Sequence, residues 1–112
     1  MTKAKELIYT QTYLSSLERS IAYLSQDSDL NGVIDRVLKV QEKFEARVTD
    51  LPLSCPCCAE LVELGVTDCR EYNVANFRIL YTFNEAHGTV TALVFMRQRQ
   101  SIRKLMLDLA LF

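Results

Sequence analysis

Four basic side chains gather near the C-terminal end of the chain, and their types suit the binding of an anion. Arg97 and Arg99 alternate, so their side chains point the same way if a strand continues through both. Arg103 and Lys104 follow, and no acidic residue lies among the four. Guanidinium groups bind phosphate or carboxylate oxygens through paired hydrogen bonds. The spacing predicts an anion-binding surface here, with a solvated strand end that leads into a helix as the alternative.

A fifth basic residue, Arg78, lies inside the strand-forming run 77–83. Because side chains alternate across a strand, Arg78 points away from its two apolar neighbours. It is either a residue that binds a target or the partner of Glu71 on an adjacent strand. Tyr81, in the same run, could stack on a partner or donate a proton, although an aromatic residue in a strand more often belongs to the core.

The cysteines are the other residues that could do chemistry, and Cys55 and Cys58 have C-x-x-C spacing. A zinc site needs four ligands, and Cys57, Cys69 or His87 would have to complete it because a second C-x-x-C pair is missing. A thioredoxin-like redox pair would need a βαβ context, which the pattern lacks. We expect reduced cysteines, no metal and no cofactor. A thiol- or zinc-dependent regulator built on Cys55 and Cys58 is the weakest alternative.

Charge is nearly balanced over the 112 residues, with 13 Lys+Arg, 14 Asp+Glu and a net charge of -1. It is unevenly distributed, since residues 1–64 carry 7 basic and 10 acidic side chains and residues 65–112 carry 6 and 4. The balance excludes a protein that coats nucleic acid by charge alone, but it permits a local basic site. No run approaches the roughly 18 apolar residues of a spanning helix. We expect one cytoplasmic domain over residues 1–112 with no membrane partner.

Hydrophobic periodicity predicts the elements that position these side chains. They are a strand at 6–10, helices at about 12–26 and from 30 to about 45, a helical turn at 59–64, strands at 69–74, 77–83 and 89–96, and a helix at 101–112. The first two helices must be antiparallel neighbours because a short turn joins them. We therefore predict an α+β fold in which an N-terminal strand and helical hairpin pack on a small antiparallel sheet, with a C-terminal helix.

Three motifs in the second half, in this order and on predicted strands, resemble the RelE/ParE superfamily of bacterial type II toxins. They are "R-E" at 70–71, "F-R-I-L-Y" at 77–81 and "R-Q-R-Q" at 97–100. The predicted N-terminal strand and hairpin agree in order and length, so the resemblance covers about the whole chain. It implies a RelE/ParE-like fold and a toxin neutralised by a cognate antitoxin, whose C-terminal segment folds across the toxin with acids opposite arginines. Higher-order toxin–antitoxin oligomers are a further implied partner state.

The superfamily contains two mechanisms. RelE-like members cut messenger RNA in the ribosome, a reaction that needs charge stabilisation and proton transfer. The resemblance places two of their arginines on Arg78 and Arg97. Their lysine pair, histidine and terminal tyrosine fall on residues of other types, which are Cys69 and Glu71, Met96, and the neighbourhood of Arg103.

ParE-like members inhibit DNA gyrase and need a binding surface instead of a catalytic set. Because the RelE-like groups are incompletely matched and the chain is net acidic, we predict a ParE-like toxin that is not an enzyme. Its target- or antitoxin-binding residues would be Arg78, Arg97, Arg99, Arg103 and Tyr81. The alternative is a ribosome-dependent mRNA endoribonuclease that uses Arg78 and Arg97.

Overall fold

One mixed sheet of four strands, in the order β1-β4-β3-β2, organises the chain in a computed structural model that describes residues 2–108. The elements are β1 (Glu6–Tyr9), α1 (Gln11–Leu24), α2 (Leu30–Asp50), α3 (Ala59–Glu63), β2 (Arg70–Val74), β3 (Phe77–Asn84), β4 (Thr89–Arg97) and α4 (Ile102–Asp108). Every predicted element is present, and the α+β class is confirmed. The part of the last predicted helix at 109–112 lies outside the described residues.

Strand β1 is the one departure from an antiparallel sheet. It pairs in parallel with β4, with Leu7 opposite Val90, whereas β2, β3 and β4 pair antiparallel. Parallel neighbours need a long connection, and the helical hairpin with β2 and β3 supplies it between β1 and β4. The expected N-terminal strand therefore lies within the sheet as one of its edges.

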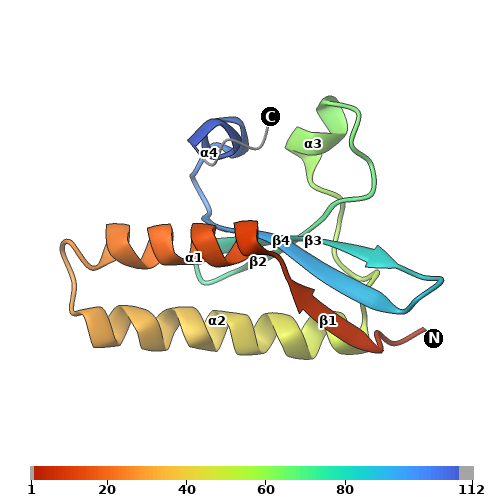
Figure 1. The fold of residues 1–112 in the computed structure, drawn as a ribbon, viewed down its shortest axis with the longest axis horizontal. Helices are drawn as coiled ribbons and strands as arrows, with labels where there is room; N and C mark the ends of the chain where they lie inside the picture. Colours follow the sequence, from red (N-terminus) through yellow and green to blue (C-terminus); the bar gives the residue numbers. More distant parts are fainter. Residues whose placement is uncertain (1, 109–112) are drawn as a thin grey trace.

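The two long helices form the predicted antiparallel hairpin on one face of the sheet (Figure 1). The side chain of Thr10 accepts a hydrogen bond from the Tyr13 N–H at 3.0 Å, and that of Asp29 accepts one from the Gly32 N–H at 2.9 Å, so each helix begins at a side-chain cap. The hairpin and sheet enclose the larger core, whose buried members include Tyr13, Val33, Val37, Val40, Phe44, Val48, Ile79 and Phe95.

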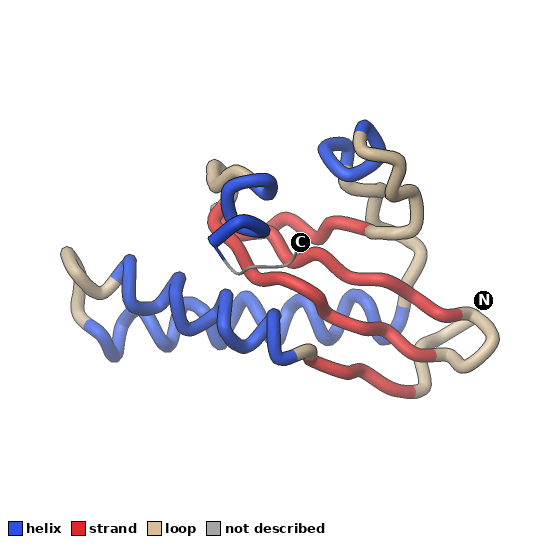
Figure 2. The backbone as a smooth tube through the Cα atoms, turned by 45° about the horizontal axis from the view of Figure 1, so that its top comes forward, coloured by secondary structure: helices blue, strands red, loops and turns tan. Residues whose placement is uncertain are grey.

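The two short helices, α3 and α4, lie over the other face of the sheet, apart from the hairpin (Figures 1 and 2). A second, smaller core forms beneath them from Cys58, Leu61, Cys69, Leu80, Val94, Met96, Ile102 and Leu105. Strands β3 and β4 thus bury apolar side chains on both faces, which confirms the central position predicted from their composition. Within the described residues, no helix has the length and apolar character needed to cross a membrane.

Helix α1 takes over from β1 as the neighbour of the C-terminal part of β4. The pairing of β1 with β4 ends at Ala92, and further along β4 the Ser16 hydroxyl accepts a hydrogen bond from the Phe95 N–H at 2.8 Å. The Thr10 hydroxyl donates to the Ala92 and Leu93 carbonyls, each at 3.2 Å, where the β3–β4 register shifts. These contacts fix the N-terminal half of α1 along β4, so the helix continues from there toward the end of the strand.

Candidate functional site

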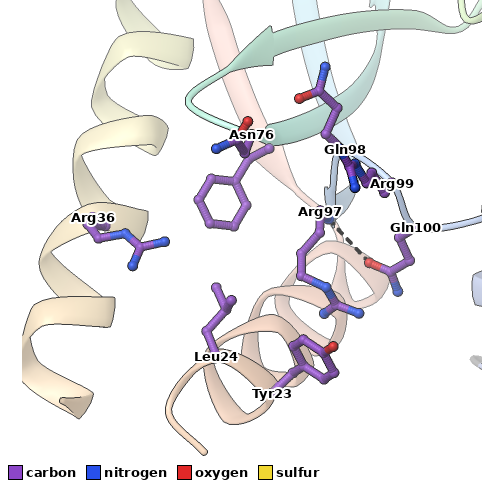
Figure 3. Close-up of a pocket in the computed structure, with 9 residues that line it drawn as sticks. Tyr23, Leu24, Arg36, Asn76, Arg97, Gln98, Arg99 and Gln100 are labelled. Atoms are coloured by element: carbon purple, nitrogen blue, oxygen red, sulfur yellow. Dashed lines mark hydrogen bonds between the residues drawn. The ribbon is translucent and has the colours of Figure 1, made fainter. Parts of the chain in front are cut away.

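Two adjoining cavities lie where β4 ends beside the C-terminal part of α1. The first, about 560 Å³, is lined by Tyr23, Leu24, Arg36, Asn76, Phe77, Arg97, Gln98, Arg99 and Gln100. The second, about 680 Å³, is lined by Arg19, Ala22, Tyr23, Gln26, Arg97, Arg99, Gln100, Ser101 and Lys104. Four residues line both cavities, so together they form one hollow, which we call the basic groove. Figure 3 draws the residues of the first cavity.

The basic groove carries five cationic side chains, namely Arg19, Arg36, Arg97, Arg99 and Lys104. None of the described residues that line it is acidic. Its electrostatic potential therefore favours an anionic partner. Three of the five, Arg97 at the end of β4 and Arg99 and Lys104 beyond it, belong to the basic cluster predicted from the sequence. Arg19 and Arg36 were not predicted, because their positions on the polar faces of the two helices indicated solvated side chains. They line the groove because the hairpin brings the two helices together.

Arg97 is held in place at the centre of the basic groove. Its guanidinium carbon lies 3.8 Å from the centroid of the Tyr23 ring, a cation–π contact between β4 and α1. Its backbone N–H donates to the Gln100 side-chain oxygen at 3.2 Å (Figure 3). Strand β4 ends at Arg97, so Arg99 lies beyond the strand, yet both arginines line the groove. The guanidinium groups of Arg97 and Arg99 therefore enter the groove from the end of β4 and from the turn that follows it.

Arg78 lies on the opposite face of the sheet from Arg97. It pairs across the strands with Met96, whose side chain must point away from that of the adjacent Arg97. Contacts bear this out, because Arg78 donates to Glu60 of α3 while Arg97 stacks on Tyr23 of α1. The structure therefore does not bring together the two arginines that the ribonuclease alternative needs.

Arg78 is buried in a network of acceptors, with 9% of its side chain exposed. Its guanidinium donates to Glu71 at 2.7 Å, to Glu60, and to the Gln100 carbonyl at 3.2 Å. Burial acts to lower the pKa of Arg78, but the two carboxylates outweigh it and the pKa is raised. The hydrogen bond from Arg78 in turn lowers the pKa of Glu60. The pairing of Arg78 with Glu71 is one of the two alternatives given from the sequence. Nothing in the sequence indicated that Glu60 would be a second partner.

The remaining predicted binding residues are dispersed. Tyr81 is fully buried and its hydroxyl donates to the Pro52 carbonyl at 2.8 Å, so it contributes to the core. Arg103 is exposed on α4 and does not line the basic groove. Of the five residues proposed from sequence, only Arg97 and Arg99 share one surface.

The cysteines do not assemble as the C-x-x-C spacing suggested. Cys55 is buried in the larger core and Cys58 in the smaller one, so the sheet layer separates the two thiols. Cys58, Glu60 and Glu71 do place their possible metal-ligating atoms within 4.8 Å of one another. Arg78 already donates to both carboxylates and so holds the position that a cation would take.

A second hollow, the apolar groove, lies on the α3–α4 face and has a volume of about 450 Å³. Its lining is mainly aliphatic and consists of Thr10, Thr12, Leu61, Val66, Asp68, Cys69, Leu80, Thr82, Leu93, Val94 and Ile102. Val66 is 40% exposed at its rim. An open apolar hollow of this kind is typical of surfaces that receive a partner segment.

The fold is that of the RelE toxins, as the resemblance implied. The isolated RelE toxin from E. coli has a TM-score of 0.56 with 10% identity, over 97% of this chain and 100% of that chain. The toxin–antitoxin complex RelBE2 from Mycobacterium tuberculosis contains a chain with a TM-score of 0.53 and 18% identity, over 89% of this chain and 97% of that one. No family profile and no curated protein matches the sequence.

Proposed function

We propose that this protein is the toxin of a toxin–antitoxin pair, acting in the cytoplasm, and that it arrests growth by binding DNA gyrase through the basic groove. The fold supports the toxin assignment, because solved structures of the same fold are RelE toxins. The observation that carries the binding mechanism is the position of Arg78. It lies on the other face from Arg97 and is neutralised by Glu60 and Glu71, so the RelE-like arginine pair is not assembled.

The basic groove supplies what a binding mechanism needs. Arg36, Arg97 and Arg99 present paired guanidinium donors to carboxylates on a protein surface, and Leu24 and Phe77 give the hollow an apolar part. Arg97 is pre-positioned by Tyr23 and Gln100, which reduces the entropy lost when a partner binds. A target or antitoxin that offers clustered acidic side chains fits this surface.

The cognate antitoxin would contact both the apolar groove and the basic groove. A segment with apolar anchors would enter the apolar groove beside Val66 and Leu93, and its acidic residues would meet arginines of the toxin. Such a segment, disordered when free, would fold on binding and could wrap around the edge of the sheet. Neutralisation would follow from occupation of surface that the target needs.

The experiment is a DNA supercoiling assay with purified gyrase and the purified full chain. The wild type should inhibit supercoiling, and Arg97→Glu should inhibit it at least tenfold less well. Arg103→Glu makes the same change of charge outside the basic groove and should act like the wild type. Gyrase that is unaffected by an excess of folded wild-type protein would refute the gyrase proposal.

Ribosome-dependent mRNA cleavage is the second candidate function. Two observations favour it, the likeness to RelE toxins and the capacity of the five cations to hold a phosphodiester strand. It would require Arg78 to leave its two carboxylates. Mapping of transcript ends in a translating extract tests it directly, since new 5′ ends within codons that appear only with the added wild-type protein and are lost with Arg97→Ala would establish cleavage and refute a purely binding toxin.

A further inference from the structure

Cys58 and Cys69 lie directly opposite each other where the segment before α3 meets the start of β2. Cys57 and Arg70 form an antiparallel bridge, so moving one residue along each chain, in opposite directions, brings Cys58 opposite Cys69. The Cys58 N–H donates to the Cys69 carbonyl at 2.8 Å, and the Glu71 N–H donates to the Pro56 carbonyl at 2.9 Å. These two hydrogen bonds fix the spacing of the two backbones.

The two thiols also share one face of this bridge. Residues directly opposite in an antiparallel pair point to the same side, and both cysteines are buried in the smaller core, with 0% and 2% exposure. Cys58 and Cys69 share a backbone hydrogen bond, and opposite residues in a hydrogen-bonded pair have Cα atoms about 5.5 Å apart. Disulfides span Cα separations of about 4.4 to 6.8 Å, so the backbone positions suit a bond without a change of fold. Both cysteines are free thiols in this structure.

We propose that Cys58 and Cys69 are a thiol pair that closes to an intramolecular disulfide on exposure to a peroxide. One thiolate attacks the peroxide, which breaks the O–O bond, releases water or an alcohol and leaves a sulfenic acid. The second thiol attacks the sulfenic sulfur, forms the S–S bond and releases water. Two thiols lose two electrons and two protons, and one peroxide is reduced. A small thiol reverses the reaction by exchange.

The bond would tie α3 to the sheet. Cys58 is the residue before α3, which otherwise anchors to the sheet through buried Leu61 and through the contact of Glu60 with Arg78. Cys69 immediately precedes β2, which carries Glu71. The oxidised chain would therefore hold the Glu60–Arg78–Glu71 network closed. It would also fix one wall of the apolar groove, which Leu61 and Cys69 line.

The exposed thiol of Cys57 serves as an internal reference for the reactivity of the buried Cys58 and Cys69 thiols. It is exposed, and its side chain points to the other side of the bridge from those of Cys58 and Cys69. Burial raises the pKa of the Cys58 thiol and raises that of Cys69 to about 12. The buried pair therefore reacts more slowly than Cys57 and does so when α3 transiently opens. The inference rests on the cysteine geometry and is independent of the proposed function.

The test uses the full chain with Cys55→Ser and Cys57→Ser, so that only Cys58 and Cys69 can pair. After treatment with hydrogen peroxide and unfolding in the presence of an alkylating agent, intact mass should show no alkylated thiol, and reduction should restore two. Cys69→Ala in the same background should keep one reactive or over-oxidised sulfur and form no internal bond. Two alkylated thiols, or sulfinic acid in place of the bond, would overturn the proposal.

Peptide mapping of oxidised wild-type protein gives a second, independent measurement that needs no variant to fold. It should recover a linked pair of peptides joined through Cys58 and Cys69. Recovery of Cys57 as the principal partner of either cysteine would overturn the proposal. In the oxidised wild type, amide exchange over residues 61–66 should slow at least tenfold relative to the reduced protein, and unchanged exchange would refute the anchoring of α3.

Discussion

The Arg78 guanidinium donates a hydrogen bond to the Glu71 carboxylate at 2.7 Å, on the face of the sheet that faces away from the basic groove. Glu60 of α3 accepts from the same guanidinium nitrogen. The pair is largely removed from water, with 9% of the Arg78 and 14% of the Glu71 side chain exposed. Arg78 therefore links α3 to β2 and β3 on the face of the sheet opposite the basic groove.

Replacement of Arg78 tests this structural role. Arg78→Ala should lower the free energy of unfolding by about 3–5 kcal/mol, because it leaves Glu71 charged and largely buried without its partner. Arg99→Ala, which removes the same charge from an exposed position, should change it by no more than about 0.5 kcal/mol. Urea denaturation measures both. Equal effects of the two substitutions would contradict a buried role for Arg78.

The pH dependence of stability tests the pairing of Glu60. Because Arg78 lowers the pKa of Glu60 in the folded chain, the pairing stabilises the fold fully above the ordinary glutamate pKa of about 4.3. The stabilisation is lost as the pH falls through the lowered folded-state pKa. Glu60→Gln should therefore destabilise the chain at pH 7 and lose less stability than the wild type on acidification. Glu63→Gln, an exposed position of the same helix, is the control and should follow the wild type.

The helix and strand pattern was predictable because it depends on local periodicity and capping. Gly65 follows the C-cap residue of α3 and has a positive φ of 88°, the conformation in which a glycine commonly ends a helix. What could not be predicted was contact between distant segments. The pairing of Glu60 with Arg78 and the entry of Arg19 and Arg36 into the basic groove depend on how α3 and the hairpin pack. Burial of Tyr81 depends on that packing as well.

Charge reversal in the basic groove tests which surface binds the target. Arg97→Glu removes a central cation and the stacking on Tyr23, and it should weaken target binding and toxicity at least tenfold. The stacking contributes only about 0.5–1 kcal/mol, so the variant should remain folded by circular dichroism. Arg103→Glu should retain full toxicity. Loss of toxicity in both variants would mean that overall charge, and not the basic groove, governs binding.

A charge placed in the apolar groove tests the antitoxin site. Val66→Asp puts a carboxylate at the rim of the groove, and it should weaken antitoxin binding about tenfold, which corresponds to about 1.4 kcal/mol. Toxicity without antitoxin should be unchanged. Leu64→Asp is the matched control, because Leu64 is 51% exposed but does not line the groove. Isothermal titration with the cognate antitoxin measures both, and equal affinities for wild type and Val66→Asp would place the antitoxin elsewhere.

Growth of a bacterial culture after controlled expression of the full chain is the most direct test of whether the chain is a toxin. Wild-type protein and Arg103→Glu should stop growth, Arg97→Glu at the same soluble level should not, and co-expression of the cognate antitoxin should restore growth. A culture that grows like the empty-vector control while it accumulates soluble wild-type protein would contradict the assignment of this chain as a toxin.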